Sequence, residues 1–174
     1  MIYVLVPDGL SIDNKENIIP SFVFRSVINY THELVKDGDE VYFAPANDFG
    51  LGISEQIAGL KFLINNYPKK SNVNYYAHQL FSKNYVDTFG NAKYLKKQYP
   101  HIMNSKIDLV CSYIHSKRAE YCFLKLGYNI NRIHRVTYKI VDEKIVNRLF
   151  YYKYKYIHIV YEFFARLFYK LKFG

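Results

Sequence analysis

Three polar side chains that could do chemistry follow one another at regular spacing in this chain: Ser112, His115 and Arg118. They come after the apolar run Asp108–Cys111 and before a helical pattern that ends at Gly127. This places them at the carboxyl end of a strand and on the first turn of a helix, where backbone N–H groups and the helix dipole favour anions. Arg118 could bind a phosphate through two parallel hydrogen bonds, and His115 could move a proton near neutral pH. The alternative is that Ser112 only caps the helix and the two basic side chains are solvated.

The elements that would position these side chains alternate along the chain. The predicted strands are Ile2–Val6, Glu40–Ala44, Val73–Ala77, Ile107–Cys111 and Arg132–Val136. The predicted helices are Phe22–Lys36, Ser54–Asn65, Thr88–Gln98, His115–Leu126 and a long last helix from about Glu143 to Lys172. The alternation predicts an α/β fold, a Rossmann-like three-layer sandwich with about five parallel strands. We expect residues 1–142 to form this domain and residues 143–174 to form an amphipathic C-terminal helix.

Polar residues follow several of the predicted strands. Asp8 and Gly9 come after the first strand, Asn47 and Asp48 after the second, and His78 after the third. Since the carboxyl ends of parallel strands share one edge of a sheet, these side chains are expected to line one crevice with His115. The chain has no Gly-x-Gly-x-x-Gly motif and no Walker loop, which argues against a dinucleotide-binding or P-loop protein.

Cys111 to Ala119 resembles the strongest signature of the ElyC/SanA/YdcF family, Thr-Ser-x-x-His-x-x-Arg-Ala, with Cys in place of the first Thr. Thr88 to Ala92 resembles the family's Thr-x-Glu-Asn-Ala, with Gly90 in place of Glu. Ser54-Glu55 at a helix start, Arg25 on the first helix and the Asp8-Gly9 loop extend the resemblance over roughly residues 1–137.

The resemblance implies a Rossmann-like domain with a small-molecule site in bacterial cell-envelope or surface-polysaccharide metabolism. On this basis His115 and Ser112 are the candidate catalytic residues. The candidate ligand-binding residues are Asp8, Gly9, Arg25, Glu55, Thr88, Asn91 and Arg118.

Three functions remain open. The first is a transferase or phosphohydrolase that acts on a nucleotide-sugar or a lipid-linked sugar phosphate. The second is a non-catalytic partner of a membrane glycosyltransferase, which Gly90 in place of Glu favours. The third is an S-adenosylmethionine-binding protein, because one family member is described as binding that cofactor. A divalent metal held by Asp8 or Glu55 beside the phosphate is a further option.

The net charge of +9 is concentrated at the C-terminus, where residues 144–174 hold seven Lys or Arg and a single acid, Glu162. Apolar residues at helical spacing, from Val146 to Leu171, form a stripe, and Lys155, Glu162, Arg166 and Lys170 fall largely on the other side. Such a helix suits an anionic membrane surface, a homodimer interface or packing on the domain. Because the rest of the chain is only mildly basic, nucleic acid is not an expected partner.

The remaining features indicate the compartment. Met1 leads directly into a strand-like segment without a signal peptide, so a cytoplasmic protein is expected, peripheral to the inner membrane if the last helix binds lipid. Cys111 and Cys122 lack metal-ligand spacing and are predicted to be reduced core thiols. His78, His101, His134 and His158 stand alone in the sequence and are predicted to be structural or exposed.

Overall fold

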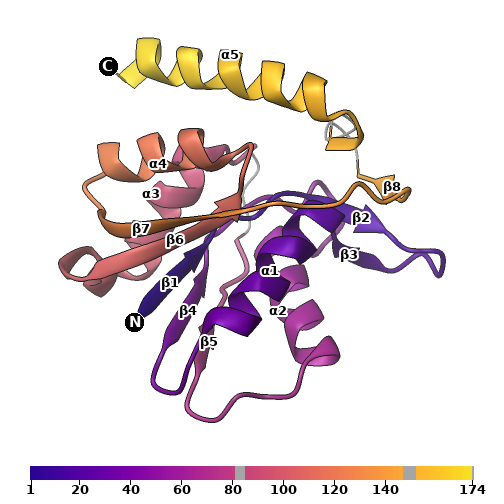
Figure 1. The fold of residues 1–174 in the computed structure, drawn as a ribbon, viewed down its shortest axis with the longest axis horizontal. Helices are drawn as coiled ribbons and strands as arrows, with labels where there is room; N and C mark the ends of the chain where they lie inside the picture. Colours follow the sequence, from indigo (N-terminus) through magenta and orange to yellow (C-terminus); the bar gives the residue numbers. More distant parts are fainter. Residues whose placement is uncertain (81–84, 147–151, 174) are drawn as a thin grey trace.

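The computed structural model of the chain describes residues 1–80, 85–146 and 152–173. Its main sheet has five parallel strands in the order β5-β4-β1-β6-β7 (Figure 1). These strands are β1 (Ile2–Leu5), β4 (Glu40–Phe43), β5 (Asn74–Tyr76), β6 (Lys106–Ser112) and β7 (Asn129–Val136). All five correspond to predicted strands, so the predicted α/β fold is confirmed.

Helices cover both faces of this sheet, as buried strands with apolar side chains on both sides require. Helices α1 (Phe22–Leu34) and α2 (Glu55–Asn66) cover one face, and α3 (Thr88–Gln98) and α4 (Ser116–Lys125) cover the other (Figure 1). The short 3-10 helix η1 (Pro100–Asn104) connects α3 to β6. Alternate residues of β1 divide between the two cores: Tyr3 and Leu5 pack toward α1, and Val4 packs toward α3 and α4.

Local signals explain most helix ends. Ser21 caps α1 through a hydrogen bond from the Phe24 amide, and Gly127 ends α4 with a φ of 86° that favours glycine. Helix α3 begins at Thr88, as predicted, and Asp87, the residue before it, is the cap and accepts from the Gly90 amide at 2.7 Å. Thr88 is therefore left free to point its hydroxyl elsewhere.

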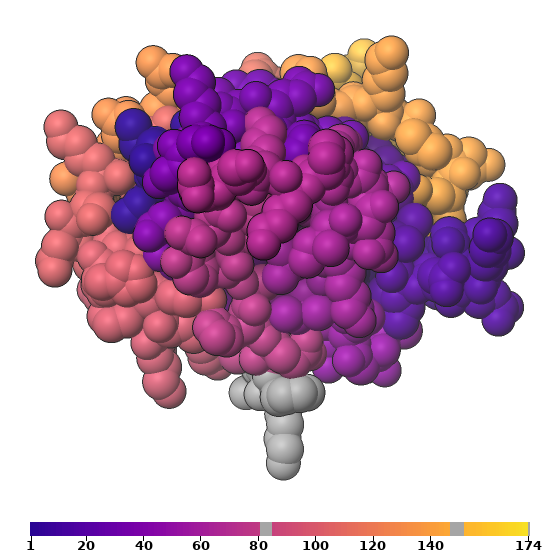
Figure 2. Space-filling model, turned by 90° about the horizontal axis from the view of Figure 1, so that it is seen from below, coloured from indigo at the N-terminus to yellow at the C-terminus, as the bar shows by residue number. Residues whose placement is uncertain are grey.

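A second, smaller sheet was not predicted. It is antiparallel, in the order β3-β2-β8, and consists of β2 (Leu10–Ile12), β3 (Ile18–Pro20) and β8 (Lys144–Ile145). In Figure 1 the β2–β3 hairpin projects to one side of the main sheet, and the view from below in Figure 2 shows the same indigo residues at the right-hand rim. Strands of two or three residues are too short to show an alternating pattern.

The prediction of one continuous C-terminal helix from about Glu143 is wrong at its beginning. Residues 144–145 form β8, and the helix α5 begins at Lys155 and ends at Phe173. Leu149 and Phe150, which belong to the predicted apolar stripe, lie outside the described residues. In the described ranges no helix is both long enough and apolar enough to cross a membrane. Both Cys111 and Cys122 are buried free thiols, as predicted.

We predict that Gly59→Val will destabilise the protein by about 2 kcal/mol, because α1 and α2 approach each other closely at this position. A Cβ atom on Gly59 would lie 2.7 Å from the Phe24 ring and 3.1 Å from the Phe43 ring. Urea unfolding measures the change, with Ile64→Val as the control, since Ile64 is an exposed residue of the same helix. A Gly59→Val protein of unchanged stability would contradict this packing.

Candidate functional site

The candidate site lies where β1 and β6 end side by side. Neighbouring elements leave the sheet in opposite directions at this point, because β1 connects through α1 to β4 on one side and β6 connects through α4 to β7 on the other. Ligands bind in α/β sheets at such a point, beyond the carboxyl ends of the strands. Asp8 follows β1, and Ser112 is the last residue of β6. His115 occupies the cap position of α4.

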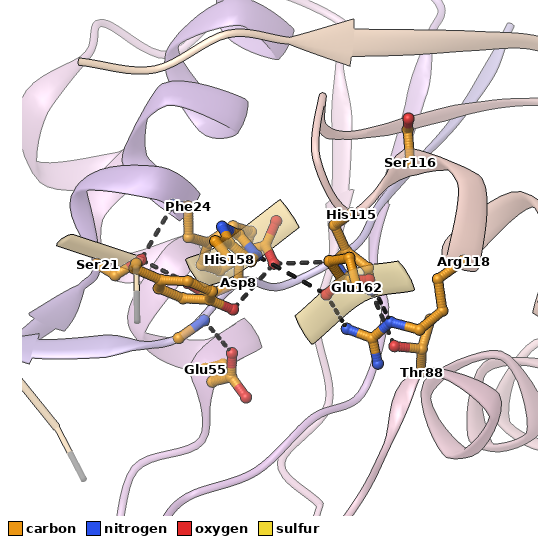
Figure 3. A network of polar contacts seen from close by, with 12 residues as sticks. Asp8, Ser21, Phe24, Glu55, Thr88, His115, Ser116, Arg118, His158 and Glu162 are labelled. Carbon is orange, nitrogen blue, oxygen red and sulfur yellow. Dashed lines mark hydrogen bonds and ion pairs between the residues drawn. The ribbon is translucent and has the colours of Figure 1, made fainter. Parts of the chain in front are cut away.

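A buried chain of hydrogen bonds connects three of the predicted residues. His115 Nδ1 lies 2.9 Å from Asp8 Oδ1, and His115 Nε2 lies 2.9 Å from Thr88 Oγ1 (Figure 3). A carboxylate only accepts, so His115 Nδ1–H donates to Asp8, and in this tautomer of the imidazole Nε2 can accept from the Thr88 hydroxyl. Asp8 therefore fixes the imidazole tautomer, and Nε2 is the nitrogen that could accept a proton.

The surroundings of Asp8 keep its carboxyl group ionised. Burial alone would raise the pKa of Asp8, but the attraction and hydrogen bond of His115, aided by His158 and the Ser112 hydroxyl, outweigh burial and lower it. The Tyr152 hydroxyl also donates to Asp8 Oδ1, at 3.1 Å. The buried Asp8 is thus held as an anion by groups from four different segments.

Glu55 behaves in the opposite way although it lies close by. The Gly9 amide donates to Glu55 Oε2 at 2.5 Å, and the Asn47 amide donates to Oε1 at 3.3 Å. Burial, with the negative charge of Asp8, outweighs these hydrogen bonds and raises the pKa of Glu55 to about 7. Two neighbouring carboxyl groups therefore differ in protonation near neutral pH, which is how acid and base roles are separated in active sites.

Arg118 points toward the same site, but its guanidinium group is already bound to a carboxylate from α5. Arg118 Nε donates to Glu162 Oε2 and Nη2 donates to Oε1, both at 2.7 Å, and both side chains are buried (Figure 3). Burial would raise the pKa of Glu162, but the Arg118 charge and a hydrogen bond from His158 lower it well below its usual range. The pair has the planar geometry, with two parallel hydrogen bonds, in which a guanidinium group binds oxyanions.

The site holds little open space. The cavity between these side chains has a volume of about 30 Å³, which is about one water molecule. It is lined by Pro7, Asp8, Gly9, Asn47, Phe49, Glu55, Tyr85, Val86, Thr88, Asn91, His115, Arg118 and Tyr152.

The structure brings together seven of the nine residues singled out from the sequence around this cavity: Asp8, Gly9, Glu55, Thr88, Asn91, His115 and Arg118. Ser112 is buried next to Asp8, and His115 pairs with Thr88, so a Ser112–His115 nucleophilic pair is not formed. Arg25 lies elsewhere, because its guanidinium pairs with Glu143 at 2.6 Å. Asn91 has a structural contact as well, since its side-chain amide donates to the Pro45 carbonyl at 2.6 Å.

Sequence reasoning missed the contributions of Tyr152, His158 and Glu162. His158, predicted to be structural or exposed, is fully buried beside the site, with Nδ1 2.9 Å from the Tyr138 hydroxyl oxygen. Glu162 was placed on the side of the last helix opposite the apolar stripe, and this side faces Arg118. One signal could have identified Glu162: it is the single acid in an otherwise basic segment.

The predicted metal has no support in the structure. In residues 1–80, 85–146 and 152–173, no group of three or more His, Cys, Asp or Glu side chains could hold a metal ion. Asp8 is engaged by His115 and Tyr152, and Glu55 by two backbone amides. The residues present therefore do not fit a metal centre.

Comparisons with known proteins do not assign the chain to a family. No family model, no curated protein and no solved structure matches this chain. Membership of the ElyC/SanA/YdcF family therefore stays a prediction from the sequence motifs.

We predict that Glu55 makes the protein less stable as the pH rises from about 4.5 to about 7. The pKa of Glu55 is higher in the folded protein than its ordinary value of 4.5, so the folded state binds more protons in this window and unfolding becomes more favourable with increasing pH. The loss should approach about 3 kcal/mol, measured by urea unfolding across this pH range. The Glu55→Gln variant should lose this pH dependence, whatever its stability at a single pH. An unchanged slope would contradict the raised pKa.

Proposed function

We propose that this protein binds a phosphate-bearing small molecule at the carboxyl edge of its sheet and acts on it as a transferase or phosphohydrolase. The main support is the buried Arg118 guanidinium, which binds a carboxylate through two hydrogen bonds. It lies beside the Asp8–His115–Thr88 chain of hydrogen bonds. An oxyanion site and a proton-transfer group are the two parts that phosphoryl chemistry needs from a protein.

Glu162 supports the choice of a phosphate as the ligand. Carboxylate and phosphate both present two oxygen atoms to a guanidinium in the same plane, so the Glu162 carboxylate stands where two phosphate oxygens would bind. A phosphate carries more negative charge and can also accept from backbone amides at the start of α4. The ligand would thus displace Glu162 from Arg118 and open the cavity.

His115 supplies the acid–base chemistry in this proposal. With Nδ1–H bound to Asp8, Nε2 accepts a proton from an attacking hydroxyl or water as the new bond to phosphorus forms and the bond to the leaving group breaks. The proton then passes from Nε2 to the leaving oxygen, which returns His115 to its neutral form. The Thr88 hydroxyl, which donates to Nε2, marks the position from which this proton is taken.

The resemblance narrows the ligand to a nucleotide-sugar or a lipid-linked sugar phosphate in envelope metabolism. A non-catalytic protein that binds the same ligand is the second candidate. Its support is the small cavity, with a volume of about 30 Å³, and the ion pair in which Glu162 already neutralises Arg118. Turnover of the bound ligand separates the two candidates.

We predict that a thermal-shift screen will find nucleotide-sugars or sugar phosphates as stabilising ligands, whereas the same sugars without phosphate have no effect. Arg118→Lys should weaken this binding at least about tenfold, because lysine keeps the charge but loses the two parallel hydrogen bonds. Isothermal titration calorimetry measures the change. A screen in which phosphate makes no difference would overturn the proposal.

We predict that His115→Asn reduces turnover of the ligand at least about 100-fold, the range expected for a lost acid–base group. His134→Asn is the matched control, since His134 also bridges a buried carboxylate, Asp108 at 2.9 Å, and a hydroxyl, Tyr30 at 3.0 Å, but lies outside the cavity. Release of phosphate or transfer product is the measurement. Tight binding without turnover in the unmodified protein would support the non-catalytic candidate.

We predict that Glu162→Gln lowers the melting temperature of the free protein and enlarges the shift caused by a phosphate ligand. Removing one member of a buried ion pair destabilises by about 3–5 kcal/mol, and a bound phosphate would restore a partner to Arg118. Glu120→Gln is the control, because Glu120 forms a half-exposed pair with Arg135 at 3.6 Å. Equal ligand-induced shifts in the two variants would show that Glu162 does not occupy the anion site.

A further inference from the structure

Helix α5 turns polar side chains such as Glu162 toward the protein and exposes most of its large apolar side chains. Its buried residues are His158, Glu162 and Tyr169. Its exposed residues are mostly large and apolar: Tyr156, Ile157, Ile159, Val160, Tyr161, Phe163, Phe164, Leu167, Phe168 and Leu171. This is the reverse of the arrangement in a helix that packs its apolar stripe against a core.

The exposed apolar residues form one continuous surface, which we call the outer face. Val160, Phe164, Leu167 and Leu171 follow one another at spacings of three or four residues, so they lie on one side of the helix. Phe164 is 62% exposed and Leu171 is 80% exposed. In Figure 1 the helix is the outermost layer above α4. A contiguous apolar surface of this kind marks a binding site.

Basic side chains border the outer face. Lys155, Arg166, Lys170 and Lys172 are the charged residues of α5 besides Glu162. Lys172 lies above the Phe168 ring, 5.5 Å from its centroid, and Arg166 lies 5.9 Å from the Phe163 ring centroid. Aromatic residues bordered by lysine and arginine are the composition of helices that lie in the interfacial layer of a membrane.

A groove beside the helix adds further positive charge. It lies between α4 and α5 and has a volume of about 490 Å³. Lys117, Arg135 and Arg166 line it together with the Arg118–Glu162 ion pair and the apolar side chains of Ile159 and Phe163. Such a lining can accept a phosphate headgroup while the neighbouring apolar residues contact acyl chains.

We propose that α5 docks in the plane of an anionic phospholipid bilayer through its outer face, with the groove beside it in contact with headgroup phosphates. Charge distinguishes this occupant from a second copy of the chain. The one acid of α5, Glu162, faces inward and is bound to Arg118, so two outer faces brought together would place only cations against each other. An anionic surface is complementary to the same charges.

Vesicle flotation of the full chain tests the proposal. Vesicles of phosphatidylcholine mixed with phosphatidylglycerol should float the protein at low salt, and vesicles of phosphatidylcholine alone should float much less of it. Phe164→Glu should abolish flotation. Ile64→Glu is the matched control, because Ile64 on α2 is also 62% exposed but lies on another side of the molecule.

The electrostatic contribution to vesicle binding is tested with two double variants. Lys170→Glu with Lys172→Glu should weaken vesicle binding at least about tenfold, whereas Lys61→Glu with Lys97→Glu, the same change in net charge on α2 and α3, should have little effect. An equal loss of vesicle binding in both double variants would show that only the net charge matters, and it would overturn the proposal that α5 is the docking surface. Salt-independent dimerisation in sedimentation, without flotation, would also overturn it and assign the outer face to a second copy.

Discussion

The ion pair between Arg118 and Glu162 is the interaction on which the site and the C-terminal helix both depend. It joins α4 to α5 across 44 positions of sequence, and both partners are buried, so removing either leaves a charge with no solvent to stabilise it. The pair attaches α5 beside the site, where the cavity between the polar side chains has a volume of about 30 Å³. An oxyanion that competes for Arg118 therefore acts on the position of the whole helix.

The strand order explains why the chemistry gathers at this edge. Because β1 and β6 are neighbours, Asp8 and His115 meet at 2.9 Å although 107 positions separate them, and α3 brings Thr88 to the other imidazole nitrogen. A second buried chain, from Asp108 through His134 to Tyr30, repeats the same chemical groups. Asp108 lies near the beginning of β6 rather than beyond its end, so this second chain is away from the edge where helix N-termini favour an anion. Position in the fold, and not the triad of groups alone, makes the first chain a candidate site.

The sequence predicts the main sheet well because its strands are buried, β-branched or aromatic runs that alternate with long helical patterns. It does not predict β2, β3 and β8, whose lengths of two or three residues carry no periodicity, or the beginning of α5. Site residues that directly follow strands, such as Asp8 and His115, could be found because parallel strands end at one edge. For Glu162 the sequence offers only an indirect signal, its being the single acid of a basic segment, and for His158 it offers none, since periodicity shows that α5 is amphipathic but not which side turns toward the protein. Arg25 was misplaced because its partner, Glu143, comes from a segment that was predicted to be helical.

The orientation of α5 connects the proposed phosphate site with the proposed membrane surface. The inner side of α5 buries His158, Glu162 and Tyr169, and the Phe173 ring at its end stacks on Phe89 of α3 with the ring centroids 4.2 Å apart. The attachment of the helix therefore combines polar contacts with Arg118 and its neighbours with an aromatic contact. Its outer face gains from any apolar environment, and that gain does not require the inner contacts to break or to form. The two faces can therefore be engaged separately or together. If a bilayer holds the outer face while a phosphate takes Arg118, the helix stays at the membrane and the cavity opens toward it, which would suit a ligand whose phosphate is carried by a lipid.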